Sequence, residues 1–410
     1  MQAVDIQEVP PAERTQPAFD LFLIFAGANI VATTLVTGAS LVGNGAPGPL
    51  LAAILAGSVL GAALVAVLAP VGPRLGVPSV VAARAVLGLR GAAFLALVLY
   101  LTNFAWIAFN NLIAASVLAR ALPVPGGRPA WVVLLGVLAT VVVVAGPRAV
   151  ALADRLAVPL MAITGGILTV RFLTLAPLAP ASSTGGPGWS SALDLVVGYQ
   201  VSWILMFADY SRYTASARRG AWAVFLGLAL TSLWFMPLGL IAARAAGSSD
   251  PGEMVAASGL GLAGATLMAL ATVTTNFVNI YLSALAFKSL VPRAGDTRSI
   301  VAIGLIGTLL PLLPGAGLDQ YVRFVELLGA LFVSVGGVLI ARLVIRPARI
   351  ELSALYDSNG PYAAHGGVDR GALLAWALGA CVYVLARPIG GTLPALATSA
   401  LLALILDRRS

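Results

Sequence analysis

The sequence predicts an all-α integral membrane protein with twelve transmembrane helices, from its composition and from the spacing of its apolar runs. Of the 410 residues, 60% are hydrophobic and only 10% are charged, and the mean hydropathy is +0.98. Soluble domains carry roughly 25% charged residues, so this chain belongs in a bilayer. A spanning helix needs about 20 mostly apolar residues. Twelve such runs cover residues 20–42, 50–70, 91–119, 130–146, 151–176, 192–210, 221–243, 260–286, 299–314, 321–345, 371–386 and 388–406.

The positive charges indicate the orientation of these runs. With a cytoplasmic N-terminus, twelve spans place eighteen Lys and Arg residues on the cytoplasmic side and six outside. This positive-inside asymmetry puts both termini in the cytoplasm. A nucleic-acid-binding stripe would need a soluble basic face, which the composition excludes although the net charge is +8. Residues 1–18 are polar and show no cleavable signal peptide.

Several kinds of chemistry are excluded by the residue types. Cys381 and His365 are the only cysteine and histidine, so no zinc-binding cluster can form within one chain. An intramembrane enzyme would need a nucleophile with a base, and a channel would need an open pore with several weak sites. The lone histidine lies in a loop, so we expect a protein that is not an enzyme and has no cofactor, and no obligatory protein partner is implied. Broken inverted halves around one polar pocket suit a carrier better than a channel.

A long polar loop separates ten runs from the last two. Within the first ten, the halves 19–176 and 191–345 each hold five runs, and the polar third run is answered by a polar eighth. Since five is odd, the second half enters the membrane from the opposite side, which gives an inverted repeat. The expected parts are a cytoplasmic tail 1–18, a transport core 19–345, a cytoplasmic loop 346–370, and accessory helices 11 and 12 with the C-terminal tail, 371–410.

The first run of each half contains residues that weaken a helix. These are Gly27 and Asn29 in the first run, and Gly198, Gln200 and Ser202 in the sixth. Glycine costs about 1 kcal/mol relative to alanine, and asparagine and serine compete for backbone hydrogen bonds. Irregular backbone at membrane depth is tolerated where it lines a cavity or is covered by protein. The paired interruptions predict a central site; small residues that only permit close packing are the alternative.

Polar side chains share one face of the third run and one face of the eighth. At 100° per residue, each set falls within an arc of about 100°. A lipid-facing arc of this kind is expensive, so both should face protein or water, as a binding site or as contacts between helices. An indole between amides suits a flat ligand, which stacks on the ring while carboxamides bind its edge. The two sets are Thr102, Asn103, Trp106 and Asn110, and Thr272, Thr275, Asn276, Asn279 and Ser283.

Five motifs follow one another over about residues 19–345: GANIVATTLVTGASL, LAPVGPRLGVPSVVAARAVLGLRGA, TNFAWIAFNN, ADYSRY and TTNFVN. In this order and spacing they resemble the purine/cytosine permease branch of the nucleobase:cation symporter family. The resemblance implies a LeuT-type fold, with a 5+5 inverted repeat and two additional C-terminal helices, in a bacterial cytoplasmic (inner) membrane. It also implies a secondary active transporter that imports cytosine or a purine by cation symport through alternating access.

The resemblance further implies a base site between the first, third, sixth and eighth helices. Trp106 matches the stacking tryptophan of the family, and Asn110 matches the polar residue one turn later. On the sixth helix, where an aromatic residue often covers the other face of the base, this chain has Gln200, with Tyr199 nearby. The expected substrate-binding residues are Trp106, Asn110, Gln200, Ser202, Trp203, Asn276, Asn279 and Asn29.

A sodium site between the first and eighth helices is implied in the same way. By motif position it comprises backbone carbonyls of Gly27, Ile30 and Ala271 with hydroxyls of Thr274 and Thr275. Na⁺ is a hard cation that neutral oxygens satisfy, and the spacing of the last three keeps them on adjoining turns. Hydroxyls that only bond back to their own helix are the alternative.

Two further alternatives concern substrate and coupling. A carrier of the same fold could take another planar heterocycle, such as a hydantoin, allantoin or hydroxymethylpyrimidine, and H⁺ could replace Na⁺. Asp209 and Arg212 in ADYSRY indicate a structural ion pair or gate element rather than a proton carrier. The expected partners are a small-molecule nucleobase and membrane lipid, with no nucleic acid.

Overall fold

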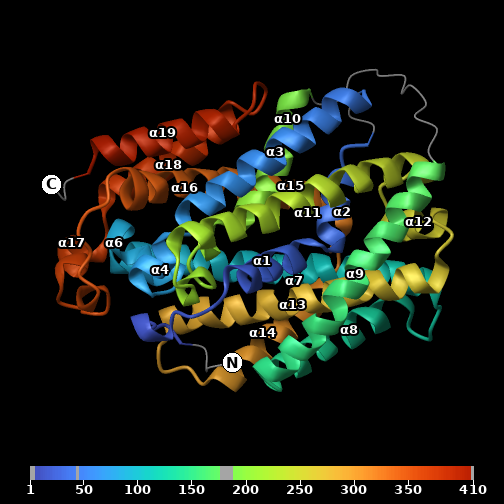
Figure 1. Cartoon of the computed structure of the whole chain (residues 1–410), viewed down its shortest axis with the longest axis horizontal. Helices are drawn as coiled ribbons and strands as arrows, with labels where there is room; N and C mark the ends of the chain where they lie inside the picture. Colours follow the sequence, from blue (N-terminus) through green and yellow to red (C-terminus); the bar gives the residue numbers. More distant parts are fainter. Residues whose placement is uncertain (1–4, 43–45, 176–187, 408–410) are drawn as a thin grey trace.

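The computed structural model describes residues 5–42, 46–175 and 188–407, and this part of the chain is helical (Figure 1). Helices occupy each of the twelve apolar runs. Among the described residues, seven helices are long and apolar enough to cross a membrane, or nine if each of two bent pairs forms one span. The all-α membrane class is confirmed, and the count of twelve spans stays a prediction.

The first apolar run is a broken helix, as its sequence predicts. Helix α1 (Ala18–Asn29) and helix α2 (Ala32–Ala39) meet at an angle of 54°. Between them Val31 is extended, with φ −137° and ψ 164°. The Thr34 hydroxyl donates to the backbone oxygen of Asn29 at 2.6 Å, which gives a partner to a carbonyl that the break removes from the helical ladder.

The sixth run changes its winding at the predicted place. Helix α10 (Trp189–Gln200) continues directly as a 3-10 helix over Val201–Met206, and a second 3-10 turn follows at Ser211–Tyr213. A mid-helix 3-10 stretch often marks a hinge or a strained sequence. The change falls at Gln200, two residues after Gly198.

The long helices form two packed groups. In the first, α1 and α2 pack on α11 (Ala217–Ala246), which also contacts α3 (Pro47–Leu68), and α3 contacts α10. In the second, α7 (Leu89–Ala121) lies along α13 (Gly261–Leu290), with α8 (Gly127–Val144) and α14 (Asp296–Leu309) beside them (Figure 1). Helix α9 (Pro147–Leu175) contacts both α11 and α13 and so joins the two groups.

Shorter elements connect these groups. The tenth run is one continuous helical segment that includes two π-helical stretches, Gly329–Val333 and Ala341–Ile345. The remaining helices are α4 (Val71–Leu75), α5 (Ser79–Ala82), α6 (Arg84–Leu87), α12 (Pro251–Ala257), α15 (Tyr321–Leu328), α16 (Ser334–Ile340), α17 (Ala364–Gly367), α18 (Arg370–Leu385) and α19 (Thr392–Ile405).

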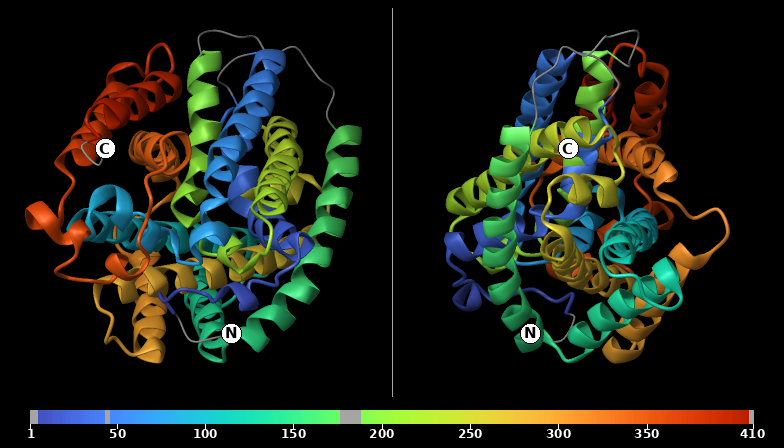
Figure 2. Two further views of the ribbon diagram at one scale, coloured as in Figure 1. Left: turned by 60° about the vertical axis from the view of Figure 1, so that its left-hand side comes forward. Right: turned by 90° about the vertical axis from the view of Figure 1, so that its right-hand side faces the viewer.

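The last two helices, α18 and α19, pack against each other and against α16 (Figure 2). Hydrogen bonds attach both ends of α19 to the core. At its start, the Asp194 carboxylate of α10 accepts hydrogen bonds from the backbone nitrogens of Gly391 (2.5 Å) and Thr392 (3.0 Å). At its end, the buried Arg342 guanidinium donates to the Ala403 carbonyl (3.1 Å) and to the Asp369 carboxylate (2.6 Å). Buried charges in contact with the core thus hold the pair in place.

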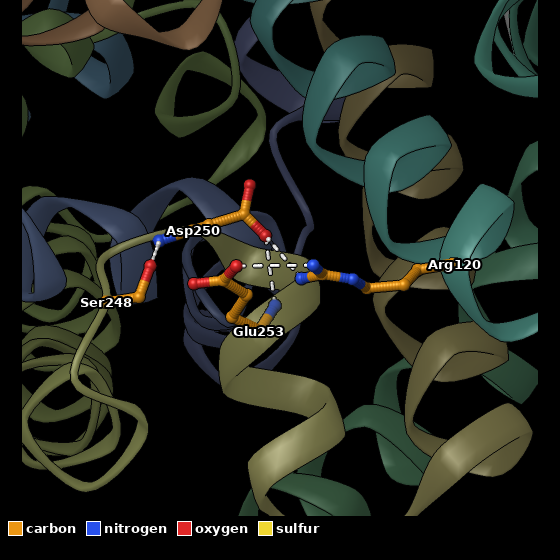
Figure 3. A network of polar contacts seen from close by, with 4 residues as sticks. All are labelled: Arg120, Ser248, Asp250 and Glu253. Atoms are coloured by element: carbon orange, nitrogen blue, oxygen red, sulfur yellow. Dashed lines mark hydrogen bonds and ion pairs between the residues drawn. The ribbon is translucent and has the colours of Figure 1, made fainter.

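A polar network connects the ends of α7 and α12 (Figure 3). The Arg120 guanidinium contacts Asp250 Oδ1 at 3.5 Å and Glu253 Oε1 at 3.2 Å. Asp250 caps α12 by accepting from the Glu253 backbone nitrogen at 3.0 Å. A hydrogen bond from Ser248 and the contact with Arg120 hold the pKa of the Glu253 carboxyl below its usual value of 4.5.

The attachment of α19 predicts a large loss of stability for Arg342→Met. The variant leaves Asp369 without its ion pair and the Ala403 carbonyl without its donor, so we expect a loss of about 3 kcal/mol in the free energy of unfolding. Thermal unfolding of the purified protein in detergent measures it. Arg346→Met is the matched control, because Arg346 is exposed and its side chain makes, within the described part of the chain, one hydrogen bond, to the Leu404 carbonyl at 3.2 Å. Equal shifts in melting temperature for both variants would contradict the assignment.

The Arg120 network predicts a specific pH dependence. Because the pKa of Glu253 is lowered by folding, its contribution to stability is present above the unfolded pKa and is lost as the pH falls through the folded value. The melting-temperature difference between wild type and Glu253→Gln should stay constant from about pH 8 to about pH 6 and disappear only in more acidic solution. A difference that already shrinks near neutral pH would refute this.

Candidate functional site

Trp106 of α7 is buried and surrounded by aromatic residues that approach it edge-on. The ring centroids of Tyr199, Tyr321 and Phe324 lie 5.6, 6.3 and 5.1 Å from its indole, with interplanar angles of 89°, 71° and 77°. Among the described residues no aromatic ring stacks parallel on it. The described rings around the buried indole are therefore all edge-on to it, and the offset stacked arrangement that planar groups prefer is not used by any of them.

The hydroxyls of the two tyrosines beside Trp106 form hydrogen bonds with the broken first helix. The Tyr199 hydroxyl shares hydrogen bonds with Thr34 at 2.6 Å and Thr33 at 3.3 Å. The Tyr321 hydroxyl shares one with Thr37 at 2.7 Å and donates to the Thr33 carbonyl at 3.0 Å. Sequence reasoning missed Tyr321, although a hydroxyl that begins an apolar run is a signal of a buried polar contact.

The predicted polar faces of the third and eighth runs meet. Asn110 Nδ2 donates to Asn276 Oδ1 at 3.0 Å, and Asn276 Nδ2 donates to Asn111 Oδ1 at 2.9 Å. All three side chains are buried. Asn111 was not predicted; the doublet of asparagines in FNNLI was its only signal. The three amides hold α7 against α13 one turn away from Trp106.

The other predicted base-site residues divide into two sets. Asn279 lies one turn beyond Asn276 and is buried, as are Ser202 and Trp203, the last edge-on to Phe25 of α1 at 5.8 Å. The second set, Asn29 and Gln200, forms hydrogen bonds with other helices.

Asn29 and Gln200 turn toward α3 and α11 instead of the amides of α7 and α13. Asn29 Nδ2 lies 2.8 Å from both Thr231 Oγ1 and Ser232 Oγ. Gln200 Nε2 lies 3.4 Å from the Ser58 carbonyl. A buried amide takes the acceptors that its neighbours offer, and α11 offers two hydroxyls at this level.

The expected sodium ligands gather at one turn of α13 and at the break of the first helix. The hydroxyls of Thr274 and Thr275 donate to the carbonyl oxygen of Ala271 at 3.0 and 2.8 Å, so three neutral oxygens converge. Gly27 lines the same cavity as Thr274, and Ile30 belongs to the same apolar cluster as Ala271. Both bonds return to the helix that carries the threonines, which is the alternative named from the sequence, and each hydroxyl keeps its lone pairs.

A cavity of about 720 Å³ leads to this place. It lies between α1, α9, α13 and the end of the sixth run, and its lining includes Gly27, Thr274, Arg155, Asp209 and Tyr281. The cavity therefore connects the charged end of α9 with the expected cation ligands.

Asp209 and Arg212 do not form the expected ion pair. Asp209 Oδ1 accepts from the Ser79 backbone nitrogen at 2.9 Å. The Arg212 guanidinium instead donates to the backbone oxygen of Asp5 at 3.0 Å and to that of Gln7 at 3.3 Å. The N-terminal segment, which sequence spacing could not place, supplies the carbonyls that this buried cation needs.

The chain matches known proteins along most of its length. The family model described as permease for cytosine/purines, uracil, thiamine, allantoin matches residues 8–403. A putative purine-cytosine permease of Bacillus subtilis (strain 168) is 25% identical over 383 residues, which cover 87% of this chain and 82% of that protein. The cytosine permease of Escherichia coli (strain K12) is 28% identical over 310 residues, covering 73% and 71% of the two chains.

Solved transporters share the fold. The nucleobase-cation-symport-1 family transporter Mhp1, in a closed conformation with bromovinylhydantoin bound, superposes with a TM-score of 0.84 at 20% identity, covering 98% of this chain and 94% of that chain. MhsT in complex with L-phenylalanine superposes with a TM-score of 0.58 at 16% identity, covering 94% and 97%. The expected LeuT-type transporter fold is thereby confirmed at the level of the fold. Because the family match spans nearly the whole sequence, this protein belongs to the cytosine/purine permeases of the nucleobase:cation symporter family.

Proposed function

We propose that this permease is a secondary active transporter that imports cytosine or a purine together with Na⁺ by alternating access. The observation that carries the proposal is the buried indole of Trp106, on which no aromatic ring of the described residues stacks. It lies one turn from Asn110, whose amide bonds that of Asn276. A base stacked there exchanges water at its edge for amide hydrogen bonds. In this proposal ten of the twelve spans form two inverted repeats of five helices each, with two accessory helices, in a bacterial inner membrane.

Sodium acts in this mechanism by joining the broken first helix to α13. A cation held by the carbonyls of Gly27, Ile30 and Ala271 and the hydroxyls of Thr274 and Thr275 stabilises the arrangement that binds the base. Sodium and base then raise each other's affinity, because coupling between two sites is reciprocal. The cavity that reaches Gly27 and Thr274 supports this location, since it offers the ion a path away from the site.

Proton coupling is the second candidate, because a carboxylate lies in the same cavity. Asp209 lines the cavity, is buried, and accepts one backbone hydrogen bond from Ser79. Uptake of labelled base into proteoliposomes, with Na⁺ replaced by choline at fixed pH, separates the candidates. Unchanged uptake would exclude Na⁺ coupling, and unlabelled hydantoin, allantoin and hydroxymethylpyrimidine as competitors would test the other planar substrates.

Stacking predicts the effect of Trp106→Ala on base binding. Base–aromatic stacking is worth about 1–3 kcal/mol, so we expect the dissociation constant of the base to rise by about 10- to 100-fold, with sodium binding largely kept. Equilibrium binding of labelled cytosine measures the change. Trp222→Ala is the control, because Trp222 is exposed on α11 and is not among the expected substrate-binding residues. Equal affinity in both variants would contradict stacking.

The sodium site predicts a difference between two similar threonines of α13. Both Thr275 and Thr272 donate to the carbonyl four residues earlier, at 2.8 and 3.0 Å, but only Thr275 belongs to the proposed ligands. Thr275→Ala should raise the Na⁺ concentration for half-maximal uptake by about tenfold. This increase corresponds to a loss of about 1.4 kcal/mol in the free energy of ion binding. Thr272→Ala should leave it unchanged, and matching effects of the two variants would refute the ligand assignment.

A further inference from the structure

The three amides between α7 and α13 form a directed chain with free groups at both ends. Each internal bond uses one NH₂ and one carbonyl oxygen, from Asn110 to Asn276 and from Asn276 to Asn111. At one end Asn110 Oδ1 is buried without a hydrogen-bond partner among the described residues, and at the other end Asn111 Nδ2 is likewise unpaired. Buried polar groups normally find partners, so these two ends are open to a ligand or to water.

The direction of this chain can reverse without losing a bond. A carboxamide carries an acceptor oxygen and a donor nitrogen in nearly the same shape, so turning all three amide planes restores both internal hydrogen bonds with opposite polarity. Asn110 then presents Nδ2 in place of Oδ1. Because neither end has a protein partner among the described residues, no hydrogen bond there favours one direction over the other.

We propose that the Asn110–Asn276–Asn111 chain binds the edge of the base and reverses the direction of its hydrogen bonds to suit that edge. One site then accepts bases with an amino group and bases with an oxo group. The proposal rests on the proposed function, since it places the base on Trp106, one turn from Asn110. An amino group such as that of cytosine donates to Asn110 Oδ1, and a carbonyl such as that of uracil accepts from Asn110 Nδ2. A fixed polar group would reject the mismatched base by about 10⁴-fold, because it would be left unpaired.

Asn111 is in this scheme a positioning residue that sets specificity through Asn276 without touching the base. Its side chain bonds only to Asn276 among the described residues. A carboxylate at position 111 accepts but does not donate, so Asn276 must donate to it and Asn110 must present its oxygen. A carboxylate at position 276 accepts from both neighbours and has the same consequence for Asn110.

The test compares the dissociation constants of cytosine and uracil in wild type, Asn111→Asp and Asn276→Asp, measured by equilibrium binding at about pH 8, where both bases are neutral. The wild-type constants should agree within about tenfold, and each carboxylate variant should shift their ratio toward cytosine by about tenfold or more. Asn111→Ala should leave the ratio near that of wild type, because it removes the end of the chain without imposing a direction.

A charge effect unrelated to the chain is excluded by Asn103→Asp. Asn103 lies on α7 one turn on the other side of Trp106, and it makes no hydrogen bond among the described residues. The chain explanation predicts no shift in the ratio for this variant, whereas a general attraction of amino bases by negative charge predicts the same shift as in the others. Variants at 111 and 276 that bind both bases with the wild-type ratio would overturn the proposal. Wild-type protein that binds neither base would instead refute the proposed function.

Discussion

The need to satisfy backbone groups inside a bilayer governs the centre of this protein. Lipid offers no hydrogen bonds, so a helix can break at membrane depth only where other groups replace its own ladder. Here the Thr34 hydroxyl bonds the Asn29 carbonyl at the break, and the Tyr199 hydroxyl bonds Thr34 in turn. The Tyr321 hydroxyl bonds Thr37 within α2. Tyr321 and Tyr199 also form two sides of the aromatic enclosure of Trp106. A hydroxyl that supports the break is therefore also bonded to a ring beside Trp106.

Helix α13 serves two regions with two faces. One face carries Thr274 and Tyr281 to the cavity, and another carries Asn276 to the amides of α7. Because the helix is a rigid element, a shift or rotation that alters one face alters the other by a fixed amount. Under the proposed function, this geometry would couple an ion on the first face to a planar molecule near the second.

The sequence indicated the buried faces of helices and the positions of helix breaks more reliably than the hydrogen-bond partners of individual side chains. Periodicity showed that Asn110 and Asn276 face inward, and helix-weakening residues showed where the first helix ends, because both depend on short-range geometry. The partners of Asn29 and Arg212 depend on which distant segment lies opposite: hydroxyls of α11 in one case and backbone oxygens of the N-terminal segment in the other. Tertiary contacts of this kind leave no periodic trace in the sequence.

The attachment of α19 at two points has a mechanical consequence. One end bonds to Asp194 on α10, and the other bonds to Arg342 at the end of the tenth run. A helix has a nearly constant length, so α19 keeps the distance between Asp194 and Arg342 fixed while both bonds are intact. If the start of α10 and the end of the tenth run moved apart, one of these bonds would break and leave a buried charge without its partner. A motion that carries both together breaks neither bond.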